Sequence, residues 1–137
     1  MTKLSAALIL GVLLLGGCSG GGKSASSASD PYAGLNDAML SWKTELAASD
    51  VSCRQAPVGS KCEMFQVSCK AQRTISPDEA AKGVTAKLVA DLGWSGYDDK
   101  GGPTPASAAA LFTRTNGAWQ RTATKPVNPE TCADLSS

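Results

Sequence analysis

The sequence contains no histidine and few aromatic residues, with three tryptophans, two tyrosines and two phenylalanines among 137 residues. Histidine is the side chain that titrates nearest to neutral pH, and it is the commonest metal ligand in proteins. Its absence excludes Ser-His-Asp and Cys-His catalysis and zinc sites that use histidine. Positive and negative charges are nearly balanced, with 13 Lys and Arg residues and 12 Asp and Glu residues. A net charge of +1 provides no electrostatic surface for nucleic acid.

Other catalytic motifs are also missing. The sequence has no glycine-rich phosphate loop and no Gly-x-Ser-x-Gly nucleophile elbow. Its acids are scattered among its bases, and no pair of them lies in an apolar stretch that would separate their pKa values, as a glycosidase requires. A chain of 137 residues holds one domain at most. We therefore predict a protein that is not an enzyme and that uses no cofactor and no metal.

The N-terminus has the pattern of an exported chain. Lys3 precedes an apolar run from Leu4 to Leu15, which is too short to cross a bilayer, since crossing takes about 20 apolar residues. A basic start followed by such a run predicts a signal peptide. The next residues, Leu15-Gly16-Gly17-Cys18, resemble the lipobox of bacterial lipoproteins. The resemblance implies cleavage before Cys18, a diacylglycerol on its thiol and a fatty acyl chain such as palmitate on its new amine.

The lipoprotein resemblance also implies a location. Lipoproteins of double-membraned bacteria with aspartate after the lipidated cysteine tend to stay at the inner membrane, and here that residue is Ser19. We therefore expect a lipid anchor in the outer membrane, with the protein on the periplasmic face. The alternatives are an ordinary secretory signal with an incidental cysteine and an uncleaved membrane-spanning helix.

The chain divides into three parts. Residues 1–17 are the predicted signal peptide, and residues 18–29 are the lipidated cysteine and a tether made of Ser, Gly and Ala apart from Lys23. A flexible tether of this length has a reach of roughly 18 Å, which keeps the domain close to the membrane surface. Residues 30–137 are the single predicted domain.

The domain contains the other four cysteines, Cys53, Cys62, Cys69 and Cys132, and an even number in an exported chain predicts two disulfides. Zinc is the alternative, but successive cysteines are separated by eight, six and sixty-two residues, without a Cys-x-x-Cys pair. Residues 63–75 alternate apolar and polar side chains as a half-buried strand does, which places Cys62 and Cys69 about 23 Å apart. That pair is therefore excluded. Of the two pairings left, we prefer Cys53 with Cys62 and Cys69 with Cys132.

Two helices are predicted. The first begins with Asp30 as N-cap and Pro31 at the first helical position. Its apolar residues follow at helical spacing: Tyr32, Leu35, Met39, Trp42 and Leu46. The second begins with a capping box between Ser76 and Glu79 and ends at Gly93. Its apolar residues are Ala81, Val84, Leu88 and Leu92.

The remaining residues predict a loop and a hairpin. Trp94 to Pro105 is assigned to a loop because of its glycines and prolines. Asn116-Gly117, between the β-prone runs 111–115 and 118–122, is a strong signal for a two-residue hairpin turn. The elements together predict an α+β fold, a small antiparallel sheet with two helices packed on one face and two disulfides. This element list resembles that of cystatin-like folds, a likeness of architecture that implies no function.

Two places carry side chains suited to binding. The hairpin turn brings four of them to one surface, with Lys125 nearby: Phe112, Arg114, Trp119 and Arg121. Arginines beside aromatic rings can bind an anionic or glycan partner; alternatively, the rings face the helices and the arginines extend past them. Trp94 and Tyr97 are the second candidates, as a docking loop or, alternatively, with Trp94 covering the core.

We therefore expect a lipoprotein that acts without catalysis by binding another envelope protein, as accessory subunits of assembly machines do. The alternative function is a module that captures a ligand or inhibits a hydrolase such as a lysozyme.

Overall fold

The computed structural model describes residues 30–135. The elements in chain order are α1 (Leu35–Ser49), α2 (Val51–Arg54), β1 (Glu63–Gln72), α3 (Pro77–Ala81), β2 (Val84–Tyr97), β3 (Pro103–Thr115) and β4 (Ala118–Ala123). The predicted signal peptide, Cys18 and the tether lie outside the described residues.

The strands form one antiparallel sheet in the order β1-β2-β3-β4, so that each strand pairs with its neighbour in the chain. β2 and β3 form the longest pair, and β4 returns along β3 after Asn116-Gly117. Both turn residues have positive φ angles, 51° and 83°, as a two-residue hairpin turn of this kind requires. The α+β class, the antiparallel sheet and the Asn-Gly hairpin are therefore confirmed.

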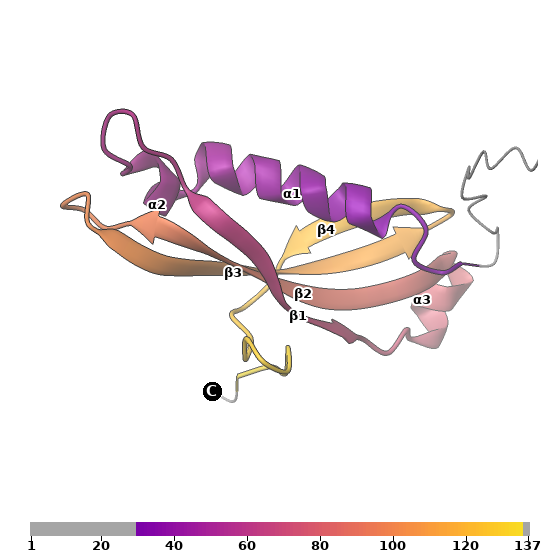
Figure 1. Ribbon diagram of the computed structural model, residues 1–137. Helices are drawn as coiled ribbons and strands as arrows, with labels where there is room; N and C mark the ends of the chain where they lie inside the picture. Colours follow the sequence, from indigo (N-terminus) through magenta and orange to yellow (C-terminus); the bar gives the residue numbers. More distant parts are fainter. Residues whose placement is uncertain (1–29, 136–137) are drawn as a thin grey trace, which may run out of the picture.

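Helix α1 lies along one face of the sheet, and the C-terminal segment lies on the opposite side (Figure 1). On α1, the predicted apolar residues Leu35, Met39 and Trp42 are buried. These side chains share one core with residues of β2 and β3, including Leu88 and Phe112. The main core of the domain therefore lies between α1 and the sheet.

The start of α1 differs from the prediction. The helix begins at Leu35 and not after Asp30, because Gly34 adopts a left-handed conformation with φ of 80°. The Asp30 carboxylate instead accepts a hydrogen bond of 2.8 Å from the backbone N–H of Tyr32, so it caps a turn that precedes the helix.

The second predicted helix is helical only at its start. Ser76 and Glu79 form the predicted capping box, and Glu79 also pairs with Lys87 of β2. The hydrogen bonds from Lys87 and from the backbone of Ser76 lower the pKa of Glu79 to about 2. The helix then ends at Ala81, Gly83 takes a φ of 88°, and the chain enters β2. The predicted helix up to Gly93 is therefore wrong, and α1 is the only long helix among the described residues.

The spacing of apolar residues in β2 explains this error. Leu88 and Leu92 are four residues apart, and a spacing of four keeps side chains on one face of a strand as well as on one face of a helix. Ala86 and Ala90, two residues before each leucine, are also buried, which is the alternation of a strand. The alternation was not evident in the sequence because alanine is also a strong helix former.

The predicted loop from Trp94 to Pro105 is mostly strand. Residues up to Tyr97 belong to β2, and β3 begins at Pro103, so that only five residues form the turn. Asp98 shapes this turn, because its carboxylate accepts hydrogen bonds of 2.9 and 2.8 Å from two backbone N–H groups within it.

Both preferred disulfides are present. Cys53 is bonded to Cys62 and Cys69 to Cys132, with Cα atoms 5.2 and 5.6 Å apart. The first closes the segment between α2 and β1. The second attaches the C-terminal tail, residues 124–135, to β1.

A bulge in β1 interrupts the predicted alternation. Val67 pairs with Leu92, but Cys69 pairs with Asp91, so Ser68 is an extra residue without a counterpart in β2. An extra residue reverses the faces to which the following side chains point. The strand also ends at Gln72, three residues before the predicted end.

Candidate functional site

The predicted hairpin surface is in contact with α1. The Phe112 ring is fully buried and meets the Trp42 ring edge to face, with centroids 5.6 Å apart. The indole N–H of Trp119 donates a hydrogen bond of 2.8 Å to the carbonyl oxygen of Ala33. The two rings therefore face the helix, which is the second of the two interpretations given by the sequence.

The two arginines of the hairpin also have partners within the chain. Arg114 donates to the carbonyl oxygen of Asp30 at 3.0 Å. Arg121 lies 5.8 Å from the centre of the Trp42 ring and forms an ion pair with Glu45 of α1. Lys125 is exposed in the tail. Arg114 thus joins β3 to the turn before α1, and Arg121 joins β4 to α1. A binding role for the hairpin residues stays a prediction.

Trp94 and Tyr97 belong to β2 and hold the neighbouring segment in place. Trp94 is buried, stacks on Phe65 of β1 at 5.3 Å, and donates from its indole N–H to the Ser52 hydroxyl at 3.0 Å. The Tyr97 hydroxyl donates to the carbonyl oxygen of Lys61 at 3.4 Å. Both side chains thus contact residues next to the Cys53–Cys62 disulfide.

Helix α2 packs very closely on β2 because Gly96 has no side chain. A Cβ atom at Gly96 would lie 2.5 Å from the Ser52 hydroxyl oxygen and 2.7 Å from the Ser52 Cβ. Ser52 donates to the Asp50 carboxylate at 2.7 Å, and Asp50 in turn accepts from the backbone N–H of Ser52 at 2.9 Å. This buried network fixes the position of α2.

The segment between the two cysteines, residues 54–61, forms a loop at the end of the molecule that also carries the β2–β3 turn (Figure 1), and we call it the tip loop. Val58 at its centre is fully exposed, with a relative accessibility of 107 %, and Met64 just beyond it is 79 % exposed. Pro57 lies against the β2–β3 turn, where a Cβ on Gly101 would be 3.3 Å from its ring. The disulfide, Tyr97 and this contact hold the tip loop in one position.

A shallow hollow adjoins the tip loop on the sheet. It has a volume of about 450 Å³ and is bordered by Met64, Pro103 and Pro105. Exposed apolar side chains are therefore present on β1 and β3 as well as in the tip loop.

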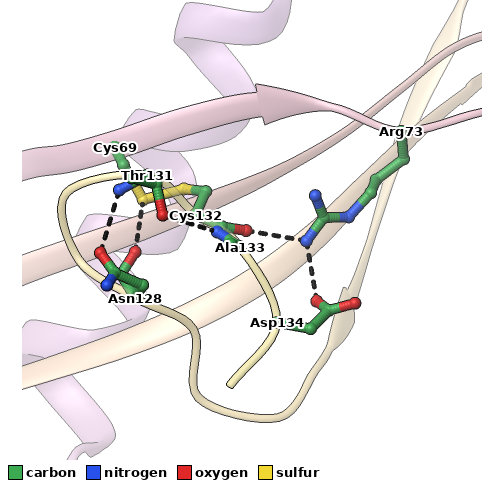
Figure 2. A network of polar contacts seen from close by, with 7 residues as sticks. All are labelled: Cys69, Arg73, Asn128, Thr131, Cys132, Ala133 and Asp134. Carbon is green, nitrogen blue, oxygen red and sulfur yellow. Dashed lines mark hydrogen bonds and ion pairs between the residues drawn. A yellow bond between two sulfur atoms is a disulfide. The ribbon is translucent and has the colours of Figure 1, made fainter. Parts of the chain in front are cut away.

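The C-terminal tail lies on the other face of the sheet, as Figure 2 shows. Besides the disulfide to Cys69, Arg73, the residue directly after β1, donates hydrogen bonds of 2.8 Å to the carbonyl oxygen of Cys132 and to the Asp134 carboxylate. Val127 and Cys132 form a second small core with Val89 of β2. The tail is thus bound to β1 by a disulfide and to Arg73 by two hydrogen bonds.

Asp91 is a buried acid on this second face. It is 3 % exposed, and its Oδ1 atom has no hydrogen-bond partner among residues 30–135. Loss of hydration raises the pKa of Asp91, and a hydrogen bond from Ser68 offsets part of the rise. Asp91 pairs with Cys69 in the β1–β2 register, so it lies next to the disulfide that holds the tail.

Neither the tip loop nor Asp91 is among the site residues predicted from the sequence. Each has a signal in the sequence: Val58 is an apolar residue between a proline and a glycine, and Asp91 interrupts the run Val89-Ala90-Asp91-Leu92. An apolar residue in a turn and an acid in an apolar strand both depart from the ordinary pattern.

Within residues 30–135, no group of three or more Cys, Asp or Glu residues is placed to hold a metal ion, and no helix could span a membrane. All four described cysteines are in disulfides. Comparison of the chain with protein-family models, with curated proteins and with solved structures finds no match.

Proposed function

We propose that this protein is a lipid-anchored envelope protein that binds another envelope protein through its tip loop and performs no catalysis. The observation that carries the proposal is the combination of exposure and rigidity at the tip. Val58 is fully exposed at the centre of a segment that a disulfide closes at both ends. Exposed apolar groups that lie close together mark interaction sites, and Met64, two residues beyond the disulfide, is also exposed. A segment closed by a disulfide loses less conformational entropy on binding than an open one does.

The anchor is supported by the lipobox-like residues Leu15-Gly16-Gly17-Cys18, and Ser19 supports the periplasmic face of the outer membrane. Two disulfides in a domain of this size support a location in an oxidising compartment outside the cytoplasm. Two or three acyl chains on Cys18 would hold the protein at the membrane permanently.

The position of the tip loop suits an anchored protein. The described chain starts at Asp30, at one end of the molecule, and α1 runs from there to the end that carries α2 and the tip loop (Figure 1). A helix of 15 residues is about 22 Å long. The tip loop therefore lies at the opposite end of the described domain from Asp30, where the predicted tether joins, which suits a partner away from the membrane surface.

A photo-crosslinking amino acid at position 58 tests the proposal in intact cells. We expect one envelope protein to be crosslinked from position 58 and not from position 40, because Leu40 is exposed on the outer side of α1 at 60 %. Val58→Asp should abolish co-purification of the crosslinked protein, whereas Leu40→Asp, a matched exposed apolar residue, should preserve it. The role of the tip loop would be refuted if both positions gave equal crosslinking, or if the crosslinked protein still co-purified with the Val58→Asp variant.

Hydrolase inhibition is the second candidate, because a protruding loop closed by a disulfide also has a shape that can enter an enzyme's cleft. Lysozyme suppression by the purified protein, measured as the clearing of a cell-wall suspension, distinguishes the two functions. If the protein inhibits lysozyme and Val58→Asp abolishes this inhibition, the partner of the tip loop is an enzyme and not an envelope protein.

The anchor has its own test. Cys18→Ala should leave a larger, unprocessed precursor on a denaturing gel, and normal processing of this variant would contradict lipidation at Cys18.

A further inference from the structure

A second pocket lies at the opposite end of the molecule from the tip loop, between the start of α1 and the end of β1. Its volume is about 400 Å³, which is within the range of sites for small ligands. Tyr32, Leu35 and Asn36 line one side, Lys70 and Gln72 line the other, and Leu88 of β2 also borders it.

The bulge at Ser68 creates the polar wall of this pocket. Lys70 pairs with Ala90 and Gln72 with Leu88, and both partners belong to the core under α1. Residues directly paired on neighbouring strands point to the same face of a sheet. The bulge therefore turns Lys70 and Gln72 toward the α1 side, where the uninterrupted alternation of β1 would have placed Cys69 and Ala71. Bulges often reorient side chains next to functional sites in this way.

The polar groups of the pocket are only partly used by the protein itself. Lys70 takes part in no ion pair among the described residues, where the paired cations are Arg73, Lys87 and Arg121. The Gln72 amide donates to the Tyr32 hydroxyl, which leaves its carbonyl oxygen as an acceptor. In contrast, Leu35 and Leu88 are 6 % and 3 % exposed and supply an apolar floor. The pocket thus combines one unpaired cation, amide groups and an apolar surface.

We propose that this pocket binds the free carboxyl terminus of a short peptide whose last side chain is apolar. The ligand carboxylate pairs with the Lys70 ammonium, the peptide amides bond to the Asn36 and Gln72 side chains, and the apolar side chain lies on Leu35 and Leu88. Asp30 also lines the pocket, and its carboxylate should weaken the binding of ligands with a second negative charge. This site is independent of the tip loop and goes beyond the proposed partner binding.

Titration of the full-length protein in detergent with the tripeptide Ala-Ala-Leu tests the proposal, with backbone amide shifts measured by NMR and affinity by calorimetry. We expect shifts confined to the pocket residues, and weaker binding by about tenfold or more when the peptide carboxylate is replaced by an amide, because one charge-assisted hydrogen bond is lost. Free leucine should bind more weakly than the tripeptide, because it has no peptide amides to bond to the Asn36 and Gln72 side chains.

Lys70→Gln should weaken tripeptide binding by a similar factor, while Lys61→Gln, an exposed lysine at the tip loop, should not. A circular dichroism spectrum and a Tm equal to those of the parent establish that Lys70→Gln is folded, and Asn36→Ala provides a second pocket variant. The proposal is wrong if the acid and the amide bind equally, if Lys70→Gln binds as the parent does, or if no pocket resonance shifts at millimolar peptide.

Discussion

Replacing Asp91 by asparagine should make the domain more stable near neutral pH and leave its stability nearly unchanged in acid. Desolvation raises the pKa of this carboxyl above its ordinary value of 3.8, and the Ser68 hydroxyl offsets part of the rise. A raised pKa means that the folded chain binds the proton more tightly than the unfolded chain does. The free energy of unfolding that Asp91 contributes is therefore fully present below about pH 4 and is lost as the pH rises through the folded-state pKa.

The size of the effect follows from the burial of the side chain. Asp91 is 3 % exposed and its Oδ1 has no partner among the described residues, so at neutral pH the fold must accommodate a poorly solvated carboxylate. An unsatisfied buried polar group costs about 1–3 kcal/mol, and more when it is charged. Asparagine has nearly the same shape and does not ionise. At pH 7.5, Asp91→Asn should therefore raise the free energy of unfolding by about 1–3 kcal/mol, or the Tm by roughly 4–8 °C for each kcal/mol.

Urea unfolding followed by tryptophan fluorescence at pH 3.5 and pH 7.5 measures this effect. The stability difference between Asp91→Asn and the parent should be near zero at the lower pH and should grow at the higher one. Asp99→Asn is the matched control, because Asp99 is exposed in the β2–β3 turn and should show no such pH dependence. If Asp91→Asn destabilises the domain at pH 7.5 and less so at pH 3.5, the carboxylate has a favourable partner and the reasoning is refuted.

Three further results are expected. The double substitution Cys69→Ser with Cys132→Ser should lower the free energy of unfolding by about 4 kcal/mol, because the disulfide spans 63 residues; urea unfolding that matches the parent would contradict this. Gly96→Ala should destabilise by about 1–3 kcal/mol through overlap with Ser52, and adding Ser52→Gly should recover part of the loss in the same assay. An NMR titration of the Glu79 carboxyl should give a pKa of about 2. The contribution of Glu79 to the free energy of unfolding is therefore fully present above pH 4.5 and disappears as the pH falls toward 2. An ordinary pKa at Glu79 would mean that the pair with Lys87 does not form in solution.

The features that the sequence predicted correctly depend on local chemistry. Asn116-Gly117 predicts its turn because both residues must take positive φ angles, and the Ser76 capping box needs only four consecutive residues. Strand geometry excluded only the Cys62–Cys69 pair, which left two of the three possible disulfide pairings, and the preferred one of these two is present.

The features that it missed depend on tertiary contacts. A spacing of four did not distinguish helix from strand in β2, and the bulge at Ser68 is specified by the register against β2, which no local pattern reveals. The hairpin face was correctly predicted to be shared by Phe112 and Trp119. That α1 lies against this face could not be deduced from the hairpin alone, because a strand pattern does not identify what packs on it.

The order of the disulfides has a consequence for how the chain would be oxidised under the proposed export across a membrane. The first domain cysteine is bonded to the second and the third to the fourth. A chain that crosses the membrane from its N-terminus presents Cys53 and Cys62 first, so these two can be joined before Cys69 arrives, and Cys69 then has only Cys132 to pair with. A thiol oxidase that joins cysteines as they emerge therefore produces the native bonds directly. Maturation of this domain should need an oxidase but no disulfide isomerase.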